Sequence, residues 1–395
     1  CGLGDEDAEH GFAKDVATCL GENACSIGDT NNMTDESWKD FYKCASNNCV
    51  DKMVTCYSGG QAADNDCEAL RLCVKTCEPD FITGEVADQG IVIMRGQDDA
   101  LRAFHNVCSH RAHPLLQGSG NARLITCPYH QWCYGTDGRF RQARGRETLE
   151  GWIPKNADLK EVRLESYGGF LFVNLDAEAT PLIEQASKFL ADMKEACPGF
   201  DDLVRAERWE IDIAANWKTV IDNNHECYHC DANYKTLMDL VEYEGKAVWS
   251  DDGITFSHKV EKRKLDNSAY AMRPQEVEQD ALFGYIWPIH IPLMFPGSSS
   301  LAMFQVLPTG PETARERWDF YFTSRVPSDQ ERRFVDYIKN VLVNEDVGLC
   351  EGVQKGLHSL GYQQGRFVID REHPEFSEHH VHFFQKMVLD GLGPG

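Results

Sequence analysis

The chain has 395 residues, of which 42% are hydrophobic, so it can form two or three domains with sizeable cores. Its net charge of −24 argues against binding to nucleic acid or to an anionic membrane surface, and most of that charge is expected on solvated surface. No run of about 18 apolar residues is present, so no transmembrane helix is predicted.

Residues 1–80 form a separate compositional unit, because nine of the 16 cysteines fall before residue 78. Helical spacing over Trp38–Cys44 and Cys67–Cys77, with a turn between them, predicts a small cysteine-rich helical module. Eight of these cysteines can form four disulfides, and reduced thiols or a metal site are the competing interpretations. The chain begins at Cys1, as a mature bacterial lipoprotein does, which makes a location at the cell envelope one hypothesis.

From Phe81 the sequence changes to short apolar or alternating runs separated by Gly, Asp and Asn. These runs predict a small antiparallel β domain over residues 81–177, and the turns between them include Asp137-Gly138, a strong hairpin signal. The predicted strands are Ile91–Met94, Leu101–Phe104, Arg123–Thr126, Gln131–Tyr134 and Gly168–Leu175.

Two loops of this predicted domain each supply one thiol and one imidazole. Cys108 and His110 stand in a Cys-x-His arrangement, and Cys127 and His130 stand in a Cys-x-x-His arrangement. A [2Fe–2S] cluster with two Cys on one iron and two His on the other needs this pattern. The alternative is a Cys2His2 zinc site, but zinc fingers usually group two cysteines and two histidines separately, whereas each loop here mixes them.

Residues 178–395 have a mixed α and β pattern. Helices are predicted over Pro181–Cys197 and Asn216–Tyr234, and a long helix is predicted to begin at Ser328, where Glu331 completes a capping box. The His-rich segment Glu378–His382 is interpreted as a coincidental surface cluster rather than a metal site. The predicted strands are Arg208–Ile213, Ile254–His258, Leu282–Phe295, Leu301–Leu307 and Arg317–Thr323.

The segments Arg102–Arg111 and Cys127–Trp132 resemble the cluster-binding motifs of Rieske non-heme iron oxygenases. The resemblance covers roughly residues 81–392 and is closest to the branch that acts on carnitine, glycine betaine and choline. It implies an α+β chain in which an antiparallel β Rieske domain precedes a helix-grip-like catalytic domain. The cysteine-rich module departs from the family, which has a short helical arm at this place.

The stretch Asn216–Cys230 resembles the family's iron-binding helix, in which an acid precedes two histidines at fixed spacing. On that pattern Glu226 matches the acid that relays electrons between two metal centres, and His229 matches the first ligand of a mononuclear Fe(II). Tyr234 stands where the second histidine belongs, and Asp346 matches the carboxylate ligand.

The tyrosine at position 234 is a serious departure, because two histidines and one carboxylate normally leave Fe(II) open for O2. A phenolate prefers ferric iron, which would hinder O2 activation. Three possibilities therefore stay open: Tyr234 is tolerated, His225 one helical turn before His229 replaces the missing ligand, or the site is lost. The alternative role for His225 is that of a polar, hydrogen-bonded residue.

The resemblance implies a monooxygenase that receives electrons from NAD(P)H through a separate reductase and hydroxylates a small cationic substrate with O2. It also implies a homotrimer with Glu226 at the subunit crossing, and a cytoplasmic location for the oxygenase part. The alternative, favoured by Tyr234, is an electron-transfer or redox-sensing protein that keeps its Rieske cluster but has a degenerate iron site.

A trimethylammonium group donates no ordinary hydrogen bond and is best held by aromatic faces. A cage is therefore a hypothesis for the aromatic residues of the second half of the chain, and ordinary core packing is the alternative for each of them. The candidates are Tyr228, Tyr285, Trp287, Phe295 and Phe304.

Overall fold

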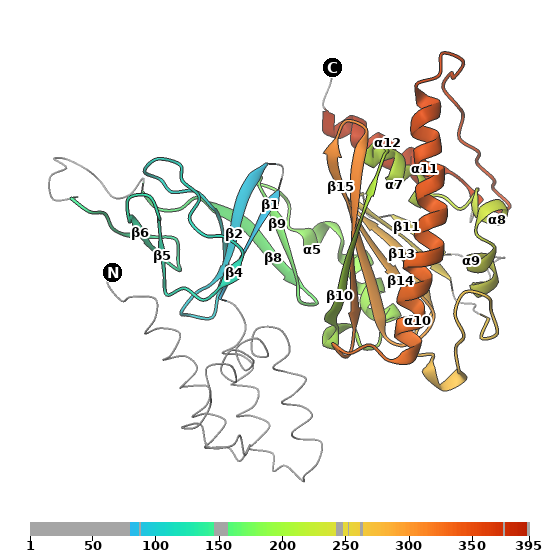
Figure 1. The fold of residues 1–395 in the computed structure, drawn as a ribbon, viewed down its shortest axis with the longest axis horizontal. Helices are drawn as coiled ribbons and strands as arrows, with labels where there is room; N and C mark the ends of the chain where they lie inside the picture. Colours follow the sequence, from blue (N-terminus) through green and yellow to red (C-terminus); the bar gives the residue numbers. More distant parts are fainter. Residues whose placement is uncertain are drawn as a thin grey trace, which may run out of the picture. The chain divides into compact units, whose positions relative to one another are not determined.

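The computed structural model describes residues 80–86, 88–145, 157–241, 248–251, 253–260, 264–373 and 376–392. The predicted cysteine-rich helical module, except for its last residue, lies outside the described residues. The chain divides into two compact units, one running to Glu165 with Phe172–Ala179 added, and one containing Ser166–Leu171 and the chain from Thr180 onward. Both units contain antiparallel sheets, and helices accompany the second, so the predicted α+β class is confirmed (Figure 1).

The first part of the chain forms a six-stranded sheet in the order β4-β1-β2-β3-β8-β9 and a three-stranded sheet in the order β5-β6-β7. Alternating apolar side chains such as Val92, Met94 and Phe104 are fully buried, which explains why these short runs become strands. The strands are β1 Phe81–Val86, β2 Gln89–Arg95, β3 Leu101–His105, β4 Ser119–Gly120, β5 Leu124–Thr126, β6 Cys133–Gly135, β7 Phe140–Gln142, β8 Glu161–Tyr167 and β9 Phe170–Asn174.

The predicted hairpin signal Asp137-Gly138 forms the turn between β6 and β7. Gly138 has a φ of 75° and donates its N–H to the carbonyl of Gly135 at 3.0 Å. A Cβ atom at position 138 would lie 2.4 Å from the ring of Phe104. Glycine is therefore required twice over, by the left-handed backbone and by the buried ring beside it.

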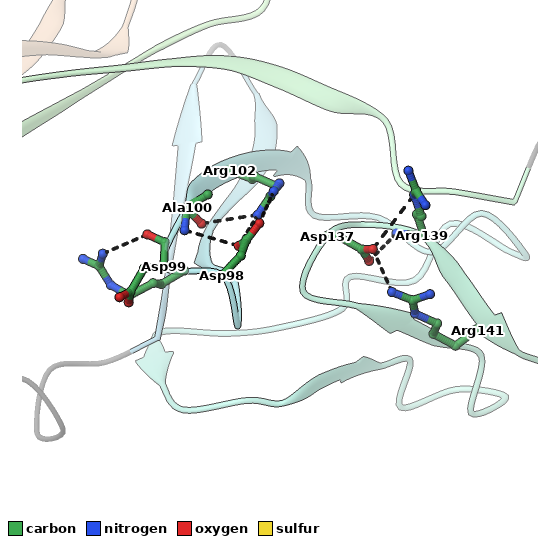
Figure 2. A network of polar contacts seen from close by, with 8 residues as sticks. Asp98, Asp99, Ala100, Arg102, Asp137, Arg139 and Arg141 are labelled. Carbon is green, nitrogen blue, oxygen red and sulfur yellow. Dashed lines mark hydrogen bonds and ion pairs between the residues drawn. The ribbon is translucent and has the colours of Figure 1, made fainter.

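Exposed ion pairs surround this turn and the loop before β3 (Figure 2). Asp137 pairs with Arg141 at 2.7 Å, and Arg102 donates two hydrogen bonds to Asp98, at 2.9 and 2.7 Å. The Arg102 guanidinium lowers the pKa of Asp98. These pairs face solvent, where water and salt screen them, so they contribute little to stability.

The second unit is built on a seven-stranded antiparallel sheet in the order β10-β16-β15-β14-β13-β12-β11. The predicted strand over Leu282–Phe295 is two strands joined by a turn; the other predicted strands are confirmed within a few residues. The strands are β10 Val204–Ile213, β11 Val248–Asp251, β12 Thr255–Val260, β13 Ala281–Ile286, β14 His290–Met294, β15 Ser300–Gly310 and β16 Thr313–Phe322.

The helices of this unit follow the predicted ones, with breaks at Ala186 and after Asn224. The α-helices are α5 Leu182–Gln185, α6 Ser187–Ala196, α7 Trp217–Asn224, α8 Cys230–Asn233, α9 Lys235–Leu240, α10 Asp329–Tyr337, α11 Val343–Leu357 and α12 His379–Leu392. Short helical turns of other types are η4 Phe200–Asp202, η5 Pro274–Glu276 and η6 Ile338–Leu342.

The long helix predicted from Ser328 is confirmed, and it runs beside the sheet as α10, η6 and α11 (Figure 1). The Ser328 side chain accepts the N–H of Glu331, and the Glu331 carboxylate accepts the N–H of Ser328, which completes the capping box. The segment η6 is a π-helical turn, which shifts the faces of the following helix relative to α10. It lies directly before the segment of α11 that carries Asp346.

The surface interpretation of the His-rich tail is wrong for His380. This residue is 3% exposed, and its ring stacks on Phe256 at 4.4 Å. Because α12 is helical, His380, Val381 and Phe384 share the face that is buried, whereas His382 points to solvent. Among the described helices, none has the length and apolar character needed to cross a membrane.

The turn at Gly138 gives a prediction about stability. We expect Gly138→Ala to lower the free energy of unfolding by about 2–4 kcal/mol, because it adds left-handed strain to overpacking against Phe104. Gly118→Ala is the matched control, since Gly118 has a φ of 72° and no described atom lies within 4 Å of the place that its Cβ would take. Denaturant unfolding of both variants measures the difference; equal losses would show that the Phe104 contact is unimportant.

Candidate functional site

The two cysteine–histidine loops have the same backbone architecture. In the first loop, the N–H of Ala112 donates to the carbonyl of Cys108 at 3.0 Å, and the N–H of Cys108 donates to the carbonyl of His113 at 2.9 Å. In the second loop, the N–H of Gln131 donates to the carbonyl of Cys127 at 2.9 Å, and the N–H of Cys127 donates to the carbonyl of Trp132 at 2.8 Å.

Each loop also has a non-glycine residue with positive φ four residues after its cysteine. These residues are Ala112, with a φ of 57°, and Gln131, with a φ of 60°. Such conformations are uncommon for residues with a Cβ and often mark functional sites. The left-handed residue closes each turn and so brings the cysteine and the histidine of a loop to the same end of the domain.

The side chains of the two loops meet in like pairs. The rings of His110 and His130 are 4.6 Å apart, and the thiols of Cys108 and Cys127 are hydrogen-bonding neighbours. Both cysteines are buried, at 3% and 1% exposed, whereas both histidines reach the surface. This is the donor arrangement that a cluster with two sulfur ligands on one iron and two nitrogen ligands on the other requires.

Tyr134 of β6 supports the buried sulfur of the first loop. Its hydroxyl lies 3.2 Å from the Cys108 sulfur and accepts the N–H of Ser109 at 3.1 Å. Burial raises the pKa of Tyr134, so the hydroxyl stays protonated. It can therefore donate a hydrogen bond to a thiolate at position 108. On the imidazole side, Trp132 stacks on His110 with ring centroids 4.7 Å apart.

A second cluster of polar side chains follows α7. Asn216 caps this helix by accepting the N–H of Lys218, and the chain leaves the helix at His225. Directly after it, Glu226 accepts hydrogen bonds from His229, through the ring Nδ1 and, at 3.2 Å, through the backbone N–H. The carboxylate therefore fixes the tautomer and the orientation of the ring, so that Nε2 is the nitrogen that carries the lone pair. That nitrogen lies 3.3 Å from the side-chain amide of Asn223.

Tyr234 and Asp346 complete this second cluster. The Tyr234 hydroxyl donates a hydrogen bond to Asp346, and the rings of His229 and Tyr234 are 4.8 Å apart. Burial raises the pKa of Asp346 to about 6, and burial together with the negative charge of Asp346 raises the pKa of Tyr234. The structure thus brings the three sequence-predicted donors together, with the tyrosine present as a neutral phenol.

His229, Tyr234 and Asp346 line one cavity of about 90 Å³. Its wall also contains Glu226 and the rings of Phe256, Phe283 and Phe295, among other residues. The charged residues among its described lining are both acidic, Glu226 and Asp346. Across the described residues, no three His, Cys, Asp or Glu side chains are placed to hold one metal ion.

Comparisons with known proteins agree with this geometry. Residues 73–155 match the family model of the Rieske [2Fe-2S] domain, and residues 200–393 match that of the ring hydroxylating alpha subunit, catalytic domain. The chain is 33% identical over 343 residues to the carnitine monooxygenase oxygenase subunit of Acinetobacter baumannii, covering 84% of this chain and 92% of that protein. The chain belongs to the Rieske non-heme iron oxygenases.

Other relatives fall in the same branch of the family. The glycine betaine monooxygenase oxygenase subunit of Chromohalobacter salexigens is 28% identical, covering 74% of this chain and 75% of that protein. A solved quaternary ammonium Rieske monooxygenase superposes with a TM-score of 0.70 at 33% identity, covering 79% of this chain and 85% of that chain. The predicted enzyme class is thereby confirmed: this is a non-heme iron monooxygenase whose cofactors are a Rieske [2Fe–2S] cluster and a mononuclear iron.

The structure supports only part of the predicted aromatic cage. Tyr228 is 56% exposed, and Phe304 stacks on Trp318 at 4.2 Å in the core. Of the five candidates, Phe295 lines the cavity. The other phenylalanine residues that line the cavity are Phe256 and Phe283. The sequence did not identify them, because the neighbours of a strand residue across the sheet depend on the tertiary structure.

Two further corrections concern residues near His229. A hydrogen-bonded role is one sequence-based expectation for His225, but neither ring nitrogen makes a hydrogen bond of acceptable geometry with a described residue. The nearby Ile221 carbonyl only opposes the lowering of the imidazole pKa that burial causes. Its ring contacts are Phe256, Tyr285 and Phe384, not the donors of the second cluster. Cys227 and Cys230 form a disulfide across three residues, and the Cys-x-x-Cys spacing is the sequence signal that could have predicted it.

The contact between Tyr134 and Cys108 predicts a change in reduction potential. Hydrogen bonds to cluster sulfurs stabilise the reduced, more negative state. We expect Tyr134→Phe to lower the potential on the order of 50 mV, since about 59 mV corresponds to a tenfold change in a one-electron equilibrium. A redox titration followed by visible absorption measures it, with the exposed Tyr362→Phe as control. An unchanged potential would show that the phenol does not donate to the sulfur.

Proposed function

We propose that the chain is the oxygenase component that hydroxylates a quaternary ammonium compound such as carnitine, glycine betaine or choline. The observation that carries the proposal is the wall of the cavity beside His229, where aromatic rings stand next to Glu226 and Asp346. Aromatic faces and carboxylates both attract a cation that cannot donate hydrogen bonds. The names of the relatives support the same substrate class.

The residues of the two clusters take distinct roles in this proposal. Cys108, His110, Cys127 and His130 would hold the cluster, and His229, Tyr234 and Asp346 would hold the mononuclear iron. When bound, these groups supply one-electron transfer and O2 chemistry. Glu226 would keep His229 in the correct tautomer and would carry the connection between centres.

We also propose the partners that this arrangement needs. A separate NAD(P)H-dependent reductase would deliver electrons through His110, which is exposed, and His130, which is partly buried, because both cysteines of the cluster set are buried. The family resemblance supports a homotrimer in which Glu226 lies at a subunit crossing.

The neutral phenol of Tyr234 favours a second candidate function, that of an electron-transfer or redox-sensing protein. In the structure Tyr234 donates a hydrogen bond to Asp346, so the carboxylate that should bind iron is already engaged. Iron binding at this place has to displace that hydrogen bond. A chain that binds the cluster but not the mononuclear iron would be limited to electron transfer.

Oxygen uptake tests the main proposal. Purified protein, a suitable reductase, NADH and O2 are expected to consume oxygen only when carnitine, glycine betaine or choline is added. Glu226→Gln is expected to reduce this rate about 10–100-fold while the cluster signal is retained, because the partner that orients His229 is weakened. The exposed Glu312→Gln serves as control. If none of the three compounds stimulates uptake by the iron-loaded protein, the substrate assignment fails.

Iron content separates the two candidate functions. A monooxygenase should contain about three irons per chain, because a two-iron cluster and one mononuclear iron are present. We expect Tyr234→His to raise occupancy of the mononuclear site, since imidazole suits Fe(II) better than a protonated phenol. Two irons per chain in the natural protein and three in Tyr234→His would favour the electron-transfer function.

A further inference from the structure

The cavity beside His229 has a disulfide in its wall. The bond joins Cys227 to Cys230, whose Cα atoms are 4.9 Å apart, and it encloses Tyr228 and His229. Both cysteines are buried, at 7% and 3% exposed, and both line the same cavity as Glu226 and His229. The cross-link is therefore part of the second cluster and encloses its candidate metal ligand.

The cross-link restrains the spacing of the acid and the imidazole. Each cysteine directly follows one partner of the hydrogen-bonded pair Glu226 and His229. The same turn is closed by two further hydrogen bonds. The N–H of Cys230 donates to the carbonyl of Cys227 at 3.1 Å, and the N–H of His229 donates to the Glu226 carboxylate at 3.2 Å. The disulfide adds a covalent restraint to a turn that is otherwise held by hydrogen bonds.

The cross-link also anchors the helix that ends at Tyr234. This helix, α8, has four residues and is too short to be stable without further contacts. The N–H of Tyr234 donates to the carbonyl of Cys230 at 2.7 Å, and the Tyr234 hydroxyl donates to Asp346. Both His229 and Tyr234 are therefore positioned through a residue of the disulfide.

The short loop that the disulfide closes shows where the cross-link acts. In the chain-entropy model a disulfide stabilises a fold by restricting the unfolded chain, and the gain increases with the number of residues enclosed. Cys227 and Cys230 are separated by 3 residues in sequence, so their bond adds little to the stability of the whole domain. Its main effect is local, because it limits opening of the turn that carries His229.

The disulfide lies beneath a surface turn. Tyr228, between the two cysteines, is 56% exposed, and residues 231–233, which follow Cys230, are exposed as well. A local opening of this turn therefore brings the sulfurs to solvent without unfolding of the sheet. The Cys-x-x-Cys arrangement is a common setting for thiol–disulfide exchange.

We propose that the bond between Cys227 and Cys230 is a redox switch that controls the order of the turn carrying His229. In the disulfide form the turn is closed, and in the dithiol form it opens more often. The reductant is a dithiol, of which one thiolate attacks a sulfur of the disulfide and the second thiol resolves the mixed disulfide. Two electrons and two protons pass to the cysteines, which become thiols, while the reductant becomes a disulfide.

Hydrogen exchange followed by mass spectrometry on the full chain tests the switch without turnover. The natural protein is compared with and without dithiothreitol, and alkylation reports whether Cys227 and Cys230 are reduced. We expect peptides covering residues 226–234 to exchange about tenfold faster after reduction, because the closed loop no longer restrains opening of the turn. Peptides from β15 and β16 are expected to exchange as before.

Variants separate this disulfide from the other cysteines, nine of which precede residue 78. The double variant Cys227→Ala with Cys230→Ala is expected to exchange fast in the 226–234 peptides with or without dithiothreitol. Cys197→Ala, which removes a free buried cysteine, is the control and should respond to the reductant like the natural protein. If the double variant does not fold, the natural protein with and without dithiothreitol still decides.

The consequence for iron rests on the proposed function, because it assumes that His229 binds the mononuclear iron. A ferrous chelator is expected to remove that iron about tenfold faster from the reduced natural protein, in proportion to the opening of the turn. The double variant should lose its iron equally fast with or without dithiothreitol.

The outcomes separate the switch from the proposed function. Unchanged exchange after confirmed reduction overturns the switch, and so does a native protein in which dithiothreitol leaves the disulfide intact. Either result leaves the monooxygenase in place if a quaternary ammonium compound stimulates oxygen uptake. Faster exchange in a chain that holds two irons in both states supports the switch and overturns the proposed function.

Discussion

The hydrogen bond between Glu226 and His229 is the interaction on which the catalytic site depends. It holds the imidazole in one tautomer and one orientation, because the carboxylate also accepts the backbone N–H of the same histidine. The other ring nitrogen, Nε2, lies 3.3 Å from the Asn223 amide and carries the lone pair that a metal ligand needs. The ring of Tyr234 lies 4.8 Å from this imidazole, and both residues line the same cavity.

The departure at Tyr234 changes the set of possible metal ligands around that ring. A histidine at this position would be a neutral ligand, whereas the phenol is kept protonated by burial and by Asp346. The result is a hydrogen-bonded acid and phenol beside a single imidazole. Iron binding at such a site would have to displace this internal hydrogen bond, so the affinity for iron is the property that separates a monooxygenase from an electron carrier.

The cavity combines aromatic rings with acidic groups. The rings and the carboxylates explain attraction of a cation, but they do not distinguish one trimethylammonium compound from another.

The sequence alone determined the family, the fold class and the cluster motif, because metal ligands at fixed spacing within one loop are a local property of the chain. It also predicted Glu226, His229 and Asp346, all three through the resemblance to the family's iron-binding pattern. What surrounds these residues is set by contacts between segments far apart in the chain. The burial of His380 against Phe256, the engagement of Tyr234 by Asp346 and the isolation of His225 each join different elements, so only the tertiary structure could decide them.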